Sequence, residues 1–182
     1  MAIEDVTERL HRICGALGRM GVPYALVGGQ AVALWVATKD PAAVRTTKGV
    51  DILLRRDDLP RAQAAARSVD LEYCEVLGVG MFLDARNPHP RQGVHLIWAG
   101  EKVRPEHPAA APSIDEQQGS PGGPTVVSLE GLVRMKLAAW RDQDRVHLRD
   151  MIDVGLIGRE MLDRLVPVLA SRLESLLAET GR

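Results

Sequence analysis

The chain has 182 residues, of which 46% are hydrophobic, 26% charged and only 3% aromatic, a composition typical of one globular domain with an aliphatic core. The 23 basic and 24 acidic side chains give a net charge of −1, which excludes a global field for holding nucleic acid and leaves only a local basic patch. Cys14 and Cys74 lack metal-binding or redox spacing, no apolar run would span a membrane, and the N-terminus lacks a secretory pattern, so we expect a cytoplasmic protein with reduced thiols.

The first half of the chain alternates between helical and strand patterns. Apolar residues recur at helical spacing over 4–20, which predicts an amphipathic helix. A buried strand over 23–27 then runs directly into the pair Gly28-Gly29, which opens a helix over 29–37. The pattern that follows predicts a strand over 49–55, an alanine-rich helix over 57–68, and strands over 71–77, 80–84 and 94–98.

The second half is helical after a long loop that is rich in proline and glycine. Ser128 is a good N-cap for the first helix after this loop. Further helices are predicted over 144–156 and 159–178, and Pro167 should kink or restart the last one. We therefore expect an α+β fold, a small mixed β-sheet flanked by helices, with an α/β core over 1–103, the loop over 104–124 and a C-terminal helical part of the same domain over 125–182.

The glycine pair between strand and helix is the first candidate site. Glycines leave backbone N–H groups uncovered and a helix N-terminus attracts anions, so Gly28, Gly29 and Gln30 suit a phosphate. The alternative is a plain tight turn from strand to helix. The next strand carries Asp51 and would project side chains at i and i+2 on one face, where a pair of carboxylates would hold Mg²⁺ against a triphosphate.

Four blocks follow one another along the chain: Gly28-Gly29, Gly49-Val50-Asp51, Lys136-Leu137-Ala138-Ala139 and Arg149-Asp150-Met151-Ile152-Asp153. In this order they resemble the nucleotidyltransferase superfamily, which has the polymerase-β-like fold. The last two blocks are similar to the Lys-hydrophobic-x-Ala helix and the Arg-Asp-x-x-Asp segment of minimal nucleotidyltransferases of the AbiEii toxin type. The resemblance implies that Gly28, Gly29, Gln30 and Lys136 bind a nucleotide, that Asp51 is a metal ligand, and that Asp51, Lys136 and Asp150 are catalytic.

The sequence departs from this family at two of the metal ligands that the resemblance implies. The family's first strand aspartate falls on Gly49, its second is Asp51, and its third carboxylate falls on His95. One carboxylate cannot hold two Mg²⁺ ions against a triphosphate, and histidine is a poor ligand for Mg²⁺. We therefore expect weak binding of Mg²⁺, while an NTP remains a candidate ligand.

Each candidate residue also has a structural interpretation. Asp51 would be a solvated carboxylate at a strand end, and His95 a partly buried histidine, unless the two bind a transition metal. Lys136 would bury its stem and extend its amine to solvent, instead of reaching a triphosphate.

The acidic residues near the end of the chain are open to the same two interpretations. Asp150 and Asp153 would form ion pairs with Arg145 and Arg149 along one helix. In the functional interpretation, Asp150 orients Lys136 or contacts the nucleotide or the acceptor.

Three functions remain open. The first is a protein of this fold with impaired or absent catalysis that still binds a nucleotide, a protein partner or RNA. The second is an active, toxin-like nucleotidyltransferase that moves a nucleotidyl group from an NTP to a tRNA, protein or small-molecule hydroxyl, with Asp84 or Asp40 as extra carboxylates. The third is a non-enzymatic, antitoxin-like module that docks a partner through the leucine stripe of 159–178, unless that stripe packs on the domain's own core.

Overall fold

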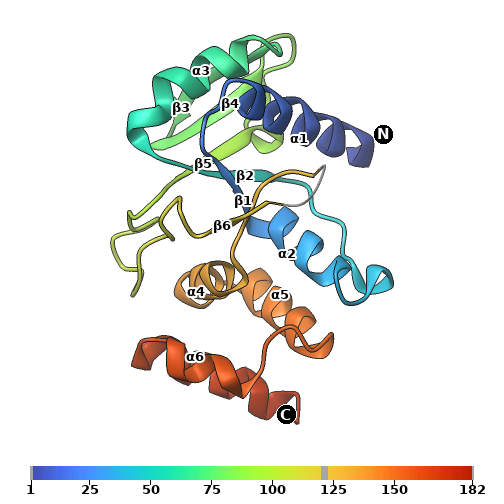
Figure 1. Cartoon of the computed structure of the whole chain (residues 1–182), viewed down its shortest axis with the longest axis vertical. Helices are drawn as coiled ribbons and strands as arrows, with labels where there is room; N and C mark the ends of the chain where they lie inside the picture. Colours follow the sequence, from blue (N-terminus) through green and yellow to red (C-terminus); the bar gives the residue numbers. More distant parts are fainter. Residues whose placement is uncertain (1, 120–122, 182) are drawn as a thin grey trace.

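The computed structural model describes residues 2–119 and 123–181 and has the expected α+β architecture (Figure 1). The helices are α1 (Ala2–Arg19), α2 (Gly28–Ala37), α3 (Leu59–Arg67), α4 (Leu129–Ala139), α5 (Asp142–Asp153) and α6 (Pro167–Glu179). The strands are β1 (Ala25–Val27), β2 (Val50–Leu54), β3 (Leu71–Val76), β4 (Val79–Asp84), β5 (Val94–Trp98), β6 (Gln117–Gln118) and β7 (Val126–Val127). Short 3₁₀ turns cover Pro41–Ala43, Arg56–Asp58, Pro90–Gln92 and Arg159–Arg164.

The described strands form one mixed, seven-stranded sheet in the order β3-β4-β5-β2-β1-β7-β6. β2 runs parallel to β5 and antiparallel to β1, so the middle of the sheet combines both pairings. In this register Asp51 lies opposite Val27 on one neighbouring strand and opposite His95 on the other. The register therefore places Val27 at the end of β1 beside two candidate site residues, Asp51 and His95, where these central strands end.

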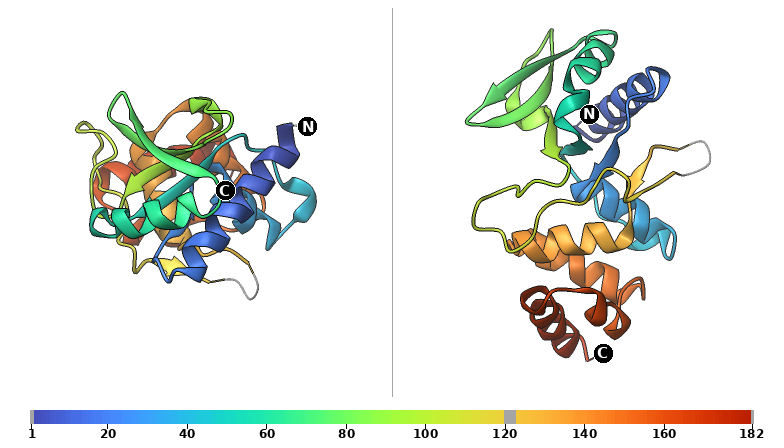
Figure 2. Two further views of the ribbon diagram at one scale, coloured as in Figure 1. Left: turned by 90° about the horizontal axis from the view of Figure 1, so that it is seen from above. Right: turned by 60° about the vertical axis from the view of Figure 1, so that its left-hand side comes forward.

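The core is aliphatic, as the composition predicts. Fully buried side chains from the first helix and the central strands, such as Ile13, Leu17, Leu26 and Ile52, belong to one continuous cluster that also includes residues of α4, α5 and α6. Helices α1 and α3 lie together at one end of the molecule beside β3 and β4, and α4, α5 and α6 lie at the other end (Figures 1 and 2). Helix α2 packs on β1 and β2 and also contacts α4 and α5.

The leucine stripe of the last helix packs on the protein's own core. Leu169, Leu173, Leu176 and Leu177 are all buried, and α6 contacts α4 and α5. Helix α6 begins at Pro167, in the first-turn position where a missing N–H costs little, so the proline restarts the helix as expected. The stripe is therefore part of the fold, and the alternative that it docks a partner is wrong.

The sequence pattern did not predict the two short strands β6 and β7. β7 pairs in parallel with β1, and β6, inside the predicted loop, pairs antiparallel with β7. The prediction of a loop throughout 104–124 was therefore wrong at Gln117–Gln118. Strands of two residues are too short to show the alternation from which strands are recognised. No helix in the described part of the chain is long and apolar enough to cross a membrane.

Candidate functional site

A cavity of about 590 Å³ lies between the strand ends and the C-terminal helices, a volume typical of a small-molecule site. One wall is formed by the ends of β1, β2 and β5 and by residues 46–49, which precede β2. The facing wall consists of residues of α4 and α5, and residues 103–111 close a third side. We call these the strand wall, the helical wall and the loop wall.

The glycine pair lies in the strand wall, where the backbone has no room for a side chain. Gly28 has φ +66°, and a Cβ there would lie 2.1 Å from Oδ2 of Asp51. A Cβ on Gly29 would lie 2.5 Å from Oγ1 of Thr47. No side chain caps α2 and its first turn holds no acidic residue, so its N–H groups and its positive end are available to an anion.

Asp51 and His95 form a contact at the centre of the strand wall. Nδ1 of His95 lies 3.4 Å from Oδ1 of Asp51, and each side chain is about one-third exposed, 29% and 31% respectively. The hydrogen bond to Asp51 is the main cause that raises the pKa of His95, and the backbone carbonyl of Pro90 also contributes, against the opposing effect of burial. His95 therefore contacts the Asp51 carboxylate from the strand position at which the resemblance implies another carboxylate.

The donor set of this wall does not fit a site for two Mg²⁺ ions. Within residues 2–119 and 123–181, no three His, Cys, Asp or Glu side chains are grouped so as to hold a metal ion. Gly49 lines the cavity but has no donor, and His95 offers nitrogen where Mg²⁺ prefers oxygen. Of the three carboxylates that the resemblance implies, at positions 49, 51 and 95, the chain therefore has only Asp51.

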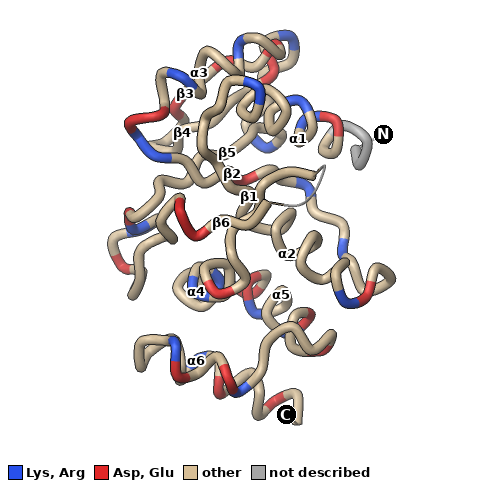
Figure 3. Tube along the Cα trace, in the orientation of Figure 1, with Lys and Arg blue, Asp and Glu red and all other residues tan. Residues whose placement is uncertain are grey.

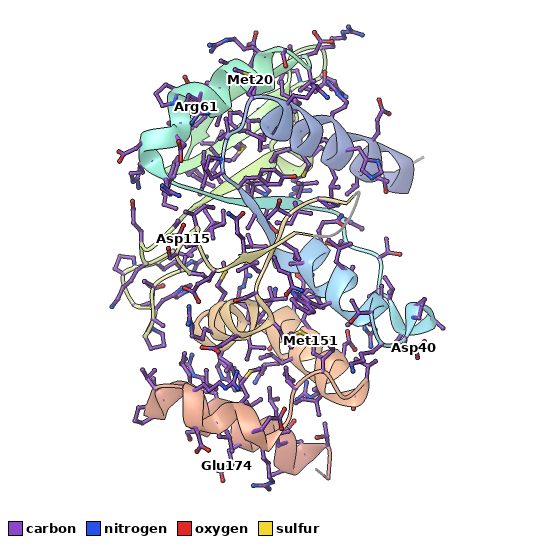
Figure 4. All side chains as sticks on the ribbon, viewed as in Figure 1. Met20, Asp40, Arg61, Asp115, Met151 and Glu174 are labelled. Atoms are coloured by element: carbon purple, nitrogen blue, oxygen red, sulfur yellow. The ribbon has the colours of Figure 1, made fainter. Side chains whose placement is uncertain are left out.

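The two carboxylates considered as replacements lie elsewhere. Asp84 accepts a hydrogen bond of 3.1 Å from Arg12. Asp40 accepts one of 2.9 Å from the backbone N–H of Ala42 and lies at an outer corner of the molecule (Figure 4). Neither residue lines the cavity, so the expectation that they complete the metal site was wrong.

The helical wall contains a buried ion pair between α4 and α5. Nζ of Lys136 lies 2.8 Å from Oδ1 of Asp144, and the side chains are only 7% and 1% exposed. Nε of Arg141 lies 2.7 Å from the other carboxylate oxygen. Burial raises the pKa of Asp144, but the hydrogen bond from Arg141 and the charge of Lys136 outweigh it, so this pKa is lowered. Lys136 therefore does not extend to solvent, and its partner is Asp144.

The sequence pattern did not indicate Asp144 as the partner of Lys136, because the two residues lie on different helices, on either side of the end of α4. Trp140 ends α4 in the left-handed conformation, with φ 53°, and the chain then reverses into α5. Asp150, the expected partner, instead accepts a hydrogen bond of 2.7 Å from Arg45. The one sequence feature that could have indicated this pair is that Lys136, near the end of a predicted helix, is followed eight residues later by Asp144.

The ion pairs on α5 also differ from the expected helical ones. Arg149 is bonded to Glu179 of α6, and Arg145 to Asp142 in the first turn of α5. Of the predicted site residues, those that line the cavity are Gly28, Gly29, Gly49, Asp51, His95 and Lys136, whereas Gln30 and Asp150 do not.

His147 on α5 is a further cavity residue that the sequence pattern did not single out. It is 7% exposed, and its Nδ1 is buried without a hydrogen-bond partner. Burial, followed by the charge of Lys136, lowers its pKa to about 4. His147 is therefore a neutral imidazole at neutral pH.

The cavity is richer in cations than in carboxylates, although charges of both signs are mixed along the whole chain (Figure 3). Its basic side chains are Lys48, Arg104, Lys136 and Arg141, against the carboxylates of Asp51 and Asp144. This excess of positive charge favours an anionic ligand.

No protein-family profile and no curated protein matches the sequence, but solved structures do match the fold. An antigenic nucleotidyltransferase-like protein from Paracoccidioides brasiliensis has a TM-score of 0.62 at 18% identity, over 98% of this chain and 90% of that one. The solution structure of the antibiotic-resistance factor ANT(2'')-Ia has a TM-score of 0.61 at 14% identity, over 100% and 97%. ANT(2'')-Ia in complex with adenylyl-2''-tobramycin gives 0.55 at 15%, over 93% and 97%. At these identities the likeness shows the fold, and the fold of this chain is nucleotidyltransferase-like.

Proposed function

We propose that this protein binds a nucleoside triphosphate in the cavity and is catalytically impaired or inactive as a nucleotidyltransferase. The observation that carries the proposal is the donor set around Asp51, where Gly49 and His95 stand in place of the expected carboxylates. Two-metal catalysis depends on ions that stabilise the attacking and leaving oxygens. A single carboxylate in contact with a histidine provides no such pair of sites.

Binding of the triphosphate is supported by the parts of the cavity that remain intact. Gly28 and Gly29 leave the N-terminus of α2 open, which suits a phosphate group. Lys48 on the strand wall adds positive charge. On the helical wall Lys136 and Arg141 share the single carboxylate of Asp144, which leaves one positive charge uncompensated. We expect Mg²⁺ to add little to the affinity of the nucleotide.

The ligand seen with ANT(2'')-Ia is not carried over to this chain. One structure of that protein is a complex with adenylyl-2''-tobramycin, whose amines are cationic at neutral pH and favour acidic surroundings. The cavity here has an excess of basic side chains, including Arg104 and Arg141. If an acceptor exists, its chemistry fits a neutral or anionic molecule, such as a tRNA or a protein hydroxyl.

An active, toxin-like enzyme remains the second candidate, on the resemblance of the Lys136 and Asp150 blocks to AbiEii-type proteins. Such an enzyme would have to work with Asp51, which among the described residues is the only cavity carboxylate not bonded to a lysine or arginine. A partner of the antitoxin kind belongs to this candidate as well. The leucine stripe of α6 is not available to such a partner, because it is buried.

Thermal unfolding with each NTP, in EDTA and in Mg²⁺, tests the proposal. At a ligand concentration of about 100 times Kd, binding adds about 2.7 kcal/mol, which raises Tm by about 5–10 °C for a chain of this size. We expect this rise in EDTA as well as in Mg²⁺, and no transfer of label from an α-labelled NTP to tRNA or protein. Transfer of label would overturn the claim of impaired catalysis, and no rise with any NTP would overturn the claim of binding.

The variant that restores both acids, Gly49→Asp with His95→Asp, is the matched comparison. A Cβ on Gly49 meets no atom within 4 Å, so the new carboxylate has space. This variant should gain a Mg²⁺-dependent rise in Tm that the natural protein lacks. If it gains none, the match of these two strands to the family is wrong.

A further inference from the structure

The segment 44–49, which leads into β2, is held to the rest of the protein by few hydrogen bonds. It belongs to no helix or strand, and within the described chain residues 45–48 make no backbone hydrogen bond. Such a segment can move by breaking few bonds, whereas the neighbouring helices and strands cannot. The residues that it contributes to the cavity are Thr46, Thr47, Lys48 and Gly49.

A single side-chain hydrogen bond of this segment, among the described residues, joins it to α5. Nε of Arg45 donates to Oδ2 of Asp150 over 2.7 Å. Gln143, Asp144 and His147 of the same helix line the cavity, whereas neither Arg45 nor Asp150 does. The Arg45–Asp150 pair therefore joins the strand wall to the helical wall from outside the cavity.

The exposure of the two partners shows which of them moves when the pair opens. The side chain of Asp150 is 13% exposed and is fixed on α5, whereas that of Arg45 is 64% exposed. Ion pairs with an exposed partner are weak and are screened by salt. The pair can therefore open transiently, and Arg45 then moves away with its segment.

The segment carries polar groups that face the open N-terminus of α2. Thr47 packs over Gly29, because a Cβ on Gly29 would lie 2.5 Å from Oγ1 of Thr47. Lys48 lines the same wall of the cavity. A hydroxyl and an ammonium group both donate hydrogen bonds to phosphate oxygens. The position of the segment therefore determines whether these two groups reach a phosphate that is bound at α2.

We propose that the segment 44–49 is a lid that closes over the ligand, and that the Arg45–Asp150 pair holds this lid closed. The inference rests on the proposed function, since it needs a ligand with phosphate groups in the cavity. Arg45 and Asp150 are positioning residues, because they act on the ligand through Thr47 and Lys48. Breaking the pair therefore speeds the release of the ligand and leaves the groups that line the cavity unchanged.

Limited proteolysis by trypsin at Lys48 measures the opening of the lid without a ligand. Arg45→Ala and Asp150→Asn should each be cleaved there about 2- to 5-fold faster than the natural protein, the effect of one exposed ion pair on the population of the open form. The double variant should be cleaved no faster than either single variant, because both changes remove the same bond. Arg45→Lys keeps the charge and should restore part of the natural resistance.

Release of a fluorescent ATP analogue, followed by stopped flow, measures the effect of the lid on a ligand. Release should be about 2- to 5-fold faster from Arg45→Ala than from the natural protein. Saturating ATP should protect Lys48 from trypsin, because the lid is then closed. Arg86→Ala is the matched control, since it breaks the exposed Arg86–Asp70 pair, of which neither residue lines the cavity. It should behave like the natural protein in both measurements.

The two measurements separate the lid from the proposed function. Cleavage at Lys48 that is no faster in Arg45→Ala and Asp150→Asn, or effects that add in the double variant, would overturn the role of the pair. Faster cleavage without faster release would overturn closure over the ligand. If the natural protein binds no ATP, the proposed function fails, and the cleavage rates still decide whether the pair holds the segment.

Discussion

Gly28 stands at a position where the backbone and the Asp51 carboxylate leave room only for hydrogen. Gly28→Ala would have a backbone at φ +66° and a Cβ 2.1 Å from Oδ2 of Asp51. We expect it to lower the free energy of unfolding by more than the 1–2 kcal/mol of the left-handed conformation alone, and to weaken NTP binding. Chemical denaturation measures the first effect and thermal shift the second.

Gly78 provides the matched control for Gly28. It has φ +78° in the turn between β3 and β4, and a Cβ there meets nothing within 4 Å. Gly78→Ala should therefore show the backbone cost, about 1–2 kcal/mol, and leave NTP binding unchanged. Equal stability losses in the two variants would show that the Asp51 carboxylate moves aside easily.

His147 predicts a specific pH dependence of stability. Its pKa is about 4 in the folded protein against 6.5 for the ordinary group, so the unfolded chain binds the proton more strongly. The stability that His147 contributes is fully present above pH 6.5 and is lost as the pH falls towards 4, by up to about 1.4 kcal/mol per pH unit. The groups that act on it, Lys136, Asp144, Asp150 and Arg141, have opposing effects.

Urea denaturation from pH 7 to 4.5 measures this dependence. The natural protein should lose more stability over this range than His147→Leu, which has no group to protonate. His89→Ala, exposed to solvent, should follow the natural protein. Parallel curves for the natural protein and His147→Leu would show that the buried imidazole is protonated in the folded state without cost.

At the scale of elements, the Lys136–Asp144 pair joins α4 to α5 across the chain reversal at Trp140. Lys136→Met should cost about 3 kcal/mol, the lower end for breaking a buried pair, because Arg141 still bonds Asp144. The double variant with Asp144→Leu should regain part of this loss, since no buried charge remains. Urea denaturation of the single and double variants measures both effects.

The exposed pair Arg145–Asp142 on the same helix is the control for burial. Its aspartate is 92% exposed, so Arg145→Ala should change stability by at most about 1 kcal/mol. A loss as large as that of Lys136→Met would mean that helix geometry, rather than burial of charge, determines the cost.

The elements that could be predicted from the sequence are those with a long, regular pattern. Helices α1 and α6 and strands β2 and β5 follow from apolar spacing, and Pro167 fixes the start of α6. The two-residue strands β6 and β7 were not predictable, because their pairing depends on β1, which lies far away in the sequence. For the candidate site, Gly28 and Asp51 line one cavity, and their roles there stay predictions. Asp144 and His147 were missed because burial arises only when α4 and α5 pack together.

At the scale of the whole molecule, the two ends of the sequence share one core. β7 from the C-terminal part pairs with β1, and the continuous cluster of buried side chains runs from α1 to α6. We therefore predict that residues 1–103 and 125–182 unfold in a single cooperative transition. Circular dichroism, dominated by the helices, and the combined fluorescence of the three tryptophans should give the same midpoint in urea. One of them, Trp35, donates a 3.0 Å hydrogen bond from Nε1 to the carbonyl of Val127. Separate midpoints would show two independent units.

The β1–β7 pairing also has a consequence for synthesis on the ribosome. Leu26 pairs with Val126, so at about 5–20 residues per second the partner of β1 is made about 5–20 s after β1 itself. During this interval one edge of β1 is open to pairing with another nascent chain. β1 has only three residues, which limits how firmly a wrong strand can pair with it. Faster translation of residues 28–125 shortens the interval in which the edge of β1 is open, so the yield of folded protein should then depend less on chaperones.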